Sequence, residues 1–231
     1  MLLNTYIVLL GLLPSTIWLF FFSREDSEKP EPLPALLYAF ILGAILPFVA
    51  LFIQLWVNGF FQDAGILITS PLAIGVFSAI EEMVKFLAVL LVVSHLKDFD
   101  EPLDAMIYMI TVALGFAATE NIGSLFSHGD AQYLLSSGKA FEVLILRFIG
   151  ATLLHALASA IIGFHWAVVM MHRKWTAVYL PIGILIAILL HGVFNYLIIE
   201  TGPASWALVF LVFISFFVLI DFEKIKELEN L

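Results

Sequence analysis

Seven long, uninterrupted apolar segments constrain this chain more than any other feature of its sequence. Each is close to the ~20 residues that an α-helix needs to cross a bilayer. The segments are residues 4–22, 35–56, 71–94, 105–125, 143–171, 176–198 and 205–221. The chain is 62% hydrophobic and 13% charged, with a mean hydropathy of +1.07, whereas soluble domains are roughly half apolar and a quarter charged. Most of its surface must therefore face lipid.

A backbone inside a bilayer must satisfy its own hydrogen bonds, which leaves helices or a closed β-barrel. Barrel strands alternate apolar and polar residues, and the long apolar runs of this chain do not. We therefore predict an all-α, polytopic transmembrane bundle of about seven spans. No internal repeat or linker between soluble domains is visible, so residues 1–231 are expected to form a single membrane-embedded domain.

Basic residues in the loops predict the orientation of the bundle, because cytoplasmic loops carry an excess of Lys and Arg. When the loops are assigned alternately to two sides, one side holds Arg24, Lys29, Lys97, Arg173, Lys174, Lys224 and Lys226. The other side holds only Lys139. The N-terminus is therefore predicted to lie outside and the C-terminus in the cytoplasm. With a net charge of −9 and no basic stripe, the chain is not expected to bind nucleic acid.

Charged residues within the third apolar segment are the first sign of function, because ionisable groups inside a membrane are costly. Glu81 and Glu82 are adjacent and point about 100° apart on a helix, so they cannot share one task. Lys85 can pair with Glu81 at i+4 or with Glu82 at i+3. The carboxylate that stays unpaired in this low-dielectric environment is the candidate general base.

Three further spans carry polar residues: Glu120 and Asn121, then Arg147 and His155, then His191 and Asn195. Arg147 precedes His155 by just over two turns and is a natural counter-ion for a carboxylate. His191 and Asn195 share a helix face and can donate hydrogen bonds to a developing oxyanion. An ion pair or interhelical hydrogen bond is the structural alternative for each residue. Together, however, these groups exceed what packing requires and predict a functional site.

These motifs, taken in order, resemble a known family. Glu81-Glu82-x-x-Lys85, Phe116-x-x-x-Glu120-Asn121, Arg147 with His155, and His191-x-x-x-Asn195 resemble the PrsW family of membrane proteases. That family looks like a branch of the CAAX-protease and bacteriocin-processing superfamily. The match covers about 120 residues of the third to sixth spans. It implies a multi-pass protein of a prokaryotic plasma membrane that hydrolyses a peptide bond in a single-span substrate, such as an anti-sigma factor at its first cleavage.

The resemblance also implies roles for the residues. Glu81 would activate a water, Glu82 would be held by the nearby cation, and His191 with Asn195 would form the oxyanion hole. The CAAX enzymes, however, have Arg one residue after the position of Lys85 and His in place of Glu120. Lys85 paired with Glu81 would free Glu82 as the base. With Glu120 in place of His, His155 is a candidate for orienting the water. Asn121 and Arg147 are expected to support these groups.

Three alternatives remain open. A zinc protease would use Glu81 or Glu82, with Glu120, His155 and His191, as ligands. We expect no metal requirement, because Lys85 and Arg147 add positive charge beside the proposed cation and no H-E-x-x-H motif is present. A proton-coupled transporter is disfavoured by the lack of an inverted repeat. A non-catalytic binding protein is disfavoured by the complete polar set.

The positions of the polar residues along their spans predict the level of the site in the membrane. With the predicted orientation, Glu81 lies roughly 15 Å from the outer end of its span and His155 roughly 18 Å. Glu120 lies about 8 Å and His191 about 10 Å from theirs. The four depths agree although the helices alternate in direction. We therefore predict a site in the outer half of the membrane and cleavage near the extracytoplasmic end of the substrate.

Overall fold

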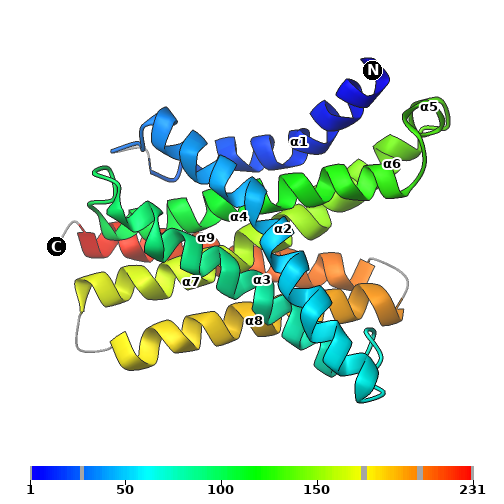
Figure 1. The fold of residues 1–231 in the computed structure, drawn as a ribbon. Coiled ribbons are helices and arrows are strands. Elements are labelled where there is room, and N and C mark those ends of the chain that lie inside the picture. Colours follow the sequence, from blue (N-terminus) through cyan, green and yellow to red (C-terminus); the bar gives the residue numbers. More distant parts are fainter. Residues whose placement is uncertain (1, 27–28, 173–175, 202–204, 230–231) are drawn as a thin grey trace.

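The computed structural model describes residues 2–26, 29–172, 176–201 and 205–229, and in these ranges all regular structure is helical (Figure 1). The α-helices are α1 (Leu2–Phe22), α2 (Leu33–Asp63), α3 (Pro71–Leu91), α4 (Pro102–Ser127), α5 (Ala131–Ser136), α6 (Lys139–Arg147), α7 (Leu153–Met171), α8 (Thr176–Thr201) and α9 (Ser205–Glu229). A short 3-10 turn, η1 (Val93–His95), follows α3, and a π-helical segment, η2 (Phe148–Thr152), joins α6 to α7.

Six stretches of the described chain are long and apolar enough to cross a membrane: α1, α2, α4, the continuous run from α6 to α7, α8 and α9. The helix α3, which carries Glu81, Glu82 and Lys85, is not one of these six stretches. It runs across the bundle beside them (Figure 1). The prediction of an all-α polytopic bundle is therefore confirmed. Seven remains the predicted number of spans.

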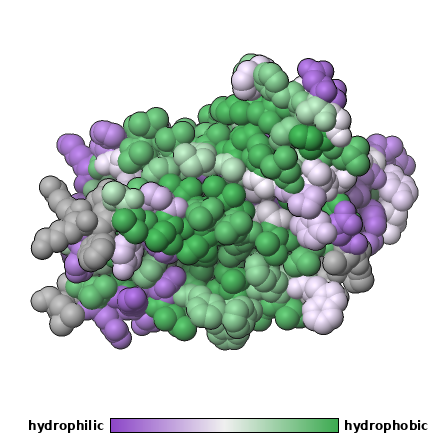
Figure 2. All heavy atoms as spheres, turned by 90° about the horizontal axis from the view of Figure 1, so that it is seen from below, coloured by the Kyte–Doolittle hydropathy of each residue, from purple (hydrophilic) through white to green (hydrophobic). Residues whose placement is uncertain are grey.

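The surface has the distribution of side chains that a membrane protein needs. Figure 2 shows a broad apolar band across the middle of the molecule, with hydrophilic residues gathered toward its two ends. At one end lie the N-terminus, α5, the start of α3 and the end of α4 (Figure 1); we call this the α5 end. The loops after α1 and α3 and the C-terminus lie at the opposite end. The basic loops after α1 and α3 and the basic C-terminal segment thus lie at the same end, as the sequence predicted. Arg173 and Lys174 of the predicted set lie outside the described residues.

The helix α4 occupies the centre of the bundle and is buried along most of its length. It approaches α2 so closely that backbone lies against backbone. A Cβ on Gly115 would lie 2.0 Å from the carbonyl oxygen of Phe40, and a Cβ on Gly43 would lie 2.1 Å from that of Val112. Small residues at such crossings permit the dense packing on which helix association in lipid depends. The two glycines therefore fix α2 against α4.

The segment between α1 and α2 is attached to the start of α4 at the opposite end of the bundle. The Asp104 carboxylate accepts hydrogen bonds from the backbone N–H groups of Asp100 and Glu101, at 2.8 and 2.7 Å, and caps the helix. Tyr108 donates its hydroxyl hydrogen to Glu31. Burial is the main cause that raises the pKa of Glu31. These contacts account for Asp104 by helix capping and for Glu31 by attachment of the loop.

Several helices extend beyond the predicted spans. The helix α2 continues to Asp63 instead of ending at residue 56, and α9 continues to Glu229 instead of ending at residue 221. The extension of α9 still has an apolar face, because Phe222 and Ile225 are completely buried. Packing against the bundle therefore prolongs the helix after the sequence has become charged. The predicted span 143–171 begins earlier, at Lys139, and contains η2.

Candidate active site

The adjacent carboxylates of α3 have different surroundings. Glu82 is completely buried, and its Oε1 lies 2.5 Å from Nζ of Lys85. The same oxygen accepts a hydrogen bond from Nδ1 of His191 on α8, at 2.7 Å. Of the two pairings that the sequence allowed, the structure therefore has the i+3 pair between Lys85 and Glu82.

Glu81 is the carboxylate without a cation partner. Its side chain is 13% exposed, and its Oε1 accepts a hydrogen bond from Nε2 of Gln54 on α2, at 2.9 Å. Its Oε2 lies 3.6 Å from Nε2 of His191. Since Nδ1–H of His191 donates to Glu82, Nε2 of a neutral ring is an acceptor. Two acceptors thus face each other, and this position is suited to a water molecule, a proton or a metal cation.

His155 on α7 joins the α3 residues to α4. Its Nδ1 lies 3.1 Å from Nζ of Lys85, and its Nε2 lies 2.9 Å from Oε2 of Glu120. An ammonium group only donates hydrogen bonds, so these partners assign the acceptor role to Nδ1 and the proton to Nε2, which donates to Glu120. The rings of His155 and His191 are nearly perpendicular, with centroids 5.0 Å apart.

Arg147, at the end of α6, approaches Glu120 from the other side. Its guanidinium lies 3.4 Å from Oε2 of Glu120 and donates from Nε to Oδ1 of Asn121, at 2.5 Å. The buried Asn121 amide in turn donates to Oγ1 of Thr152, at 3.0 Å. These contacts support the predicted roles of Arg147 as a counter-ion and of Asn121 as a supporting residue.

The π-helical segment η2 explains how Arg147 and His155 reach the same carboxylate. In a regular α-helix, residues eight apart point about 80° away from each other. A π-helical turn takes up an additional residue and changes this register. Because η2 lies between Arg147 and His155, both side chains face Glu120. The sequence pattern alone did not show this wide turn.

The cluster contains three carboxylates and two cations, so one carboxylate is in excess. Lys85 pairs with Glu82 and Arg147 with Glu120, which leaves Glu81 without a cation. Its immediate partners are the amide of Gln54 and the imidazole of His191. Glu81 is therefore the most available base in the cluster.

Two further results concern residues at the edge of the cluster. Asn195, one turn beyond His191, is half-buried and makes no hydrogen bond to the other candidate residues in the described part of the chain. The sequence analysis missed Gln54, which contacts Glu81, and Thr152, which contacts Asn121. Gln54 was recognisable as an amide within an apolar span. Thr152 gave no such signal, because threonine is common in membrane helices.

Three residues of the cluster have the arrangement of a possible metal site. Glu81, His155 and His191 each offer one ligand atom, and these atoms all lie within 4.8 Å of one another. Two histidines and a glutamate are a known donor set of catalytic zinc. His191 also has the second contact typical of a metal-bound histidine, because its other nitrogen donates to the Glu82 carboxylate.

Comparison with known proteins identifies the family. The model of a family described as "PrsW family intramembrane metalloprotease" matches residues 31–220. The chain belongs to the PrsW family. A protein named Protease PrsW from Geobacillus kaustophilus is 34% identical, over 82% of this chain and 78% of that relative. Proteins of the same name from Oceanobacillus iheyensis and Bacillus subtilis are 27% and 28% identical, with at least 93% of either chain covered in each case.

No solved structure matches the chain. Its membership of the PrsW family, together with the apolar helices, makes it a multi-pass bacterial membrane protein and a peptidase. The predicted resemblance to the PrsW family is confirmed. The family description also names a metalloprotease, which bears on the zinc alternative.

Proposed function

We propose that the chain hydrolyses a peptide bond of a membrane-anchored substrate with a water molecule activated by Glu81. The proposal rests on the Glu81 carboxylate, which has no Lys or Arg partner among the described residues and whose Oε2 lies 3.6 Å from Nε2 of His191. A water between these two acceptors can donate a hydrogen bond to each. General-base catalysis requires such direct contact between the base and the proton that it removes.

The proposed reaction uses Glu81 twice. Glu81 takes a proton from the water as the water oxygen adds to the carbonyl carbon of the substrate. The C–N bond then breaks, and Glu81 returns the proton to the departing amine nitrogen. Asn195 is one turn from His191, and its amide is available to donate a hydrogen bond to the carbonyl oxygen on which negative charge develops.

The other polar residues hold this arrangement in place. Lys85 balances Glu82, and Glu82 fixes the ring of His191 through its hydrogen bond to Nδ1. Arg147 balances Glu120, which accepts the hydrogen bond from His155. This hydrogen bond fixes the ring of His155, which lies beside Glu81 and His191. Complete burial strengthens the pair between Lys85 and Glu82, since charges interact more strongly in a low dielectric.

We propose further that the substrate is a single-span protein, such as an anti-sigma factor, cut near its extracytoplasmic end. Glu81 lies ten residues from the start of α3, Glu120 seven from the end of α4, and His191 ten from the end of α8, and all three of these helix termini are at the α5 end. The site is therefore roughly 10–15 Å from that end at the helical rise. The distribution of basic residues in the loops predicts that the α5 end lies outside the cell.

We expect the new termini of a cleaved single-span substrate to map to the extracytoplasmic half of its span. Mass spectrometry of the two products from reconstituted enzyme measures this directly. A matched substrate with its span inverted in sequence controls for a local sequence preference. Termini in the cytoplasmic half of the native substrate would contradict both the orientation and the proposed first cleavage of an anti-sigma factor.

A zinc-dependent peptidase is the second candidate, favoured by the donor set and the family description. Glu81, His155 and His191 would hold the ion, which would polarise the substrate carbonyl and make the bound water more acidic. The 3.6 Å between the Glu81 and His191 atoms suits two ligands that are each about 2.0–2.2 Å from one zinc. His155 fits less well, because Lys85 occupies its Nδ1 and leaves the proton on Nε2.

The first candidate predicts that turnover persists in the presence of a strong chelator, because a water activated by Glu81 needs no ion. Purified protein would also contain less than one equivalent of zinc by elemental analysis. Thermal unfolding with and without added zinc provides a measure that is independent of activity. Loss of turnover on chelation, with recovery on adding zinc, would instead establish the second candidate.

A further inference from the structure

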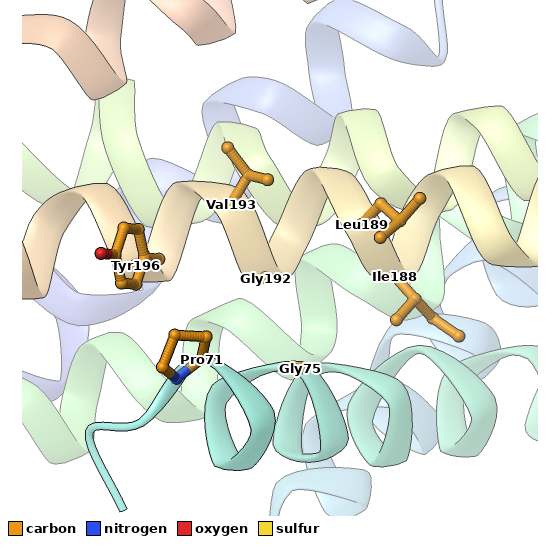
Figure 3. Close-up of a pocket in the computed structure, with 7 residues that line it drawn as sticks. All are labelled: Pro71, Gly75, Ile188, Leu189, Gly192, Val193 and Tyr196. Carbon is orange, nitrogen blue, oxygen red and sulfur yellow. The ribbon is translucent and has the colours of Figure 1, made fainter.

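A groove of about 340 Å³ lies between α3 and α8, close to the proposed active site. Figure 3 shows the two helices side by side, with Pro71 and Gly75 on α3 facing the α8 residues. The groove is lined by Pro71, Gly75, Ile188, Leu189, Gly192, Val193 and Tyr196. Its volume is at the lower end of the roughly 300–1,000 Å³ of ligand sites. A volume of this size suits one or two side chains.

The groove is open to the lipid side of the molecule. Leu189 and Val193, which line it, are 56% and 44% exposed. A Cβ built on Gly75 would meet no atom within 4 Å, so an available side-chain position is left unfilled. Helices in lipid associate through close van der Waals packing, and an unfilled position between them forgoes part of that attraction. The groove is therefore suited to an apolar group that enters from the membrane.

Ser78 indicates the chemical class of the occupant. Its side chain is 1% exposed, and its Oγ has no hydrogen-bond partner among the residues that the structure describes. This oxygen lies 3.8 Å from the position of a Cβ on Gly192, which is one of the residues that line the groove. A buried hydroxyl without a partner costs about 1–3 kcal/mol. A lipid acyl chain has no group to satisfy it, whereas a peptide backbone offers both a donor and an acceptor.

The groove is continuous with the catalytic cluster. Gly192 is adjacent in sequence to His191, and Ser78 is one turn before Glu81 and Glu82 on α3. Gly75 precedes Glu81 by six residues, which corresponds to about 9 Å along the helix. An extended peptide covers that distance with about three residues. A chain whose scissile bond is beside Glu81 would thus place a residue in the groove.

We propose that this groove is a specificity site of the protease, which binds an apolar side chain about three residues from the scissile bond, with Ser78 hydrogen-bonded to the substrate backbone. The inference rests on the proposed function. It requires the bound segment of the substrate to be unwound, because the backbone groups of an intact helix are already paired. The bound residue lies on the side of the scissile bond toward the α5 end of the bundle.

Filling the groove by Gly75→Leu tests the proposal, with Gly59→Leu on α2 as the matched control. A Cβ on either glycine meets no atom within 4 Å, and both changes raise helix propensity by a similar amount. We expect Gly75→Leu to lower kcat/KM for a single-span substrate by about 10–200-fold, and Gly59→Leu to retain the wild-type value. Substrates with alanine at successive positions should restore cleavage by Gly75→Leu when the alanine is about three residues from the cut.

Ser78→Ala provides an independent measure. Because Ser78 makes no hydrogen bond within the described protein, its loss should leave thermal stability unchanged and lower kcat/KM by about tenfold. Wild-type cleavage by both Gly75→Leu and Ser78→Ala would overturn the groove proposal. If Gly75→Leu loses a co-purified lipid while its cleavage is unchanged, the groove binds lipid and the proposal is likewise overturned. If Gly75→Leu fails to fold, Gly75→Ala takes its place. Inactivity of the wild-type protein on every single-span substrate would instead overturn the proposed function.

Discussion

We expect Glu81→Gln to lower kcat for peptide hydrolysis by about 10²–10⁴-fold, the usual loss when a general base is removed. Glutamine has nearly the same shape, and its side-chain oxygen can still accept the hydrogen bond from Gln54. The variant should therefore insert and fold as the wild type does. Single-turnover cleavage of a single-span substrate in proteoliposomes, with circular dichroism on the same samples, measures both properties.

Glu142→Gln is the control, since Glu142 is 59% exposed and its ion pair in the described part of the chain is with Lys139 on its own helix. Its turnover should match that of the wild type. The neighbouring substitution Glu82→Gln is also informative, because it breaks the buried pair with Lys85 and should lower stability as well as turnover. Wild-type turnover by Glu81→Gln would refute the role of Glu81 in both the metal-free and the zinc-dependent candidates.

The second large effect is expected from Lys85→Met, which we predict to lower the free energy of unfolding by about 3–5 kcal/mol. Lys85 and Glu82 are both completely buried, and their charged atoms are 2.5 Å apart. Methionine retains much of the side-chain volume but leaves the Glu82 charge without its cation. Unfolding in mixed micelles with increasing SDS, followed by circular dichroism, gives the comparison with wild type.

Two variants separate loss of the buried pair from loss of a lysine in general. Lys139→Met removes the exposed partner of Glu142 and should cost less than about 1 kcal/mol. The double variant with Glu82→Gln and Lys85→Met removes both buried charges and should recover part of the stability that Lys85→Met loses. Equal stability of Lys85→Met and Lys139→Met would show that the buried pair contributes little.

Most members of the candidate cluster could be selected from the sequence, because an ionisable group in an apolar span has few explanations apart from function. The contacts of Glu81, Glu82, Glu120, His155 and His191 in one cluster agree with the convergence of depths that their positions along the spans indicated. Asn195 was placed with them by its i+4 spacing from His191 and by the resemblance, yet it makes no hydrogen bond to them in the described chain.

The sequence by itself determined that the chain is a helical membrane bundle, because only long apolar segments with internally paired backbones are stable in lipid. It also determined which residues are too polar to be there by packing alone. Only the tertiary structure decided which carboxylate Lys85 neutralises, because i+3 and i+4 partners are equally near on one helix. The choice follows from His191 and Gln54, which α8 and α2 bring against α3. Glu81 is left unpaired by contacts between helices, which spacing along a single helix cannot specify.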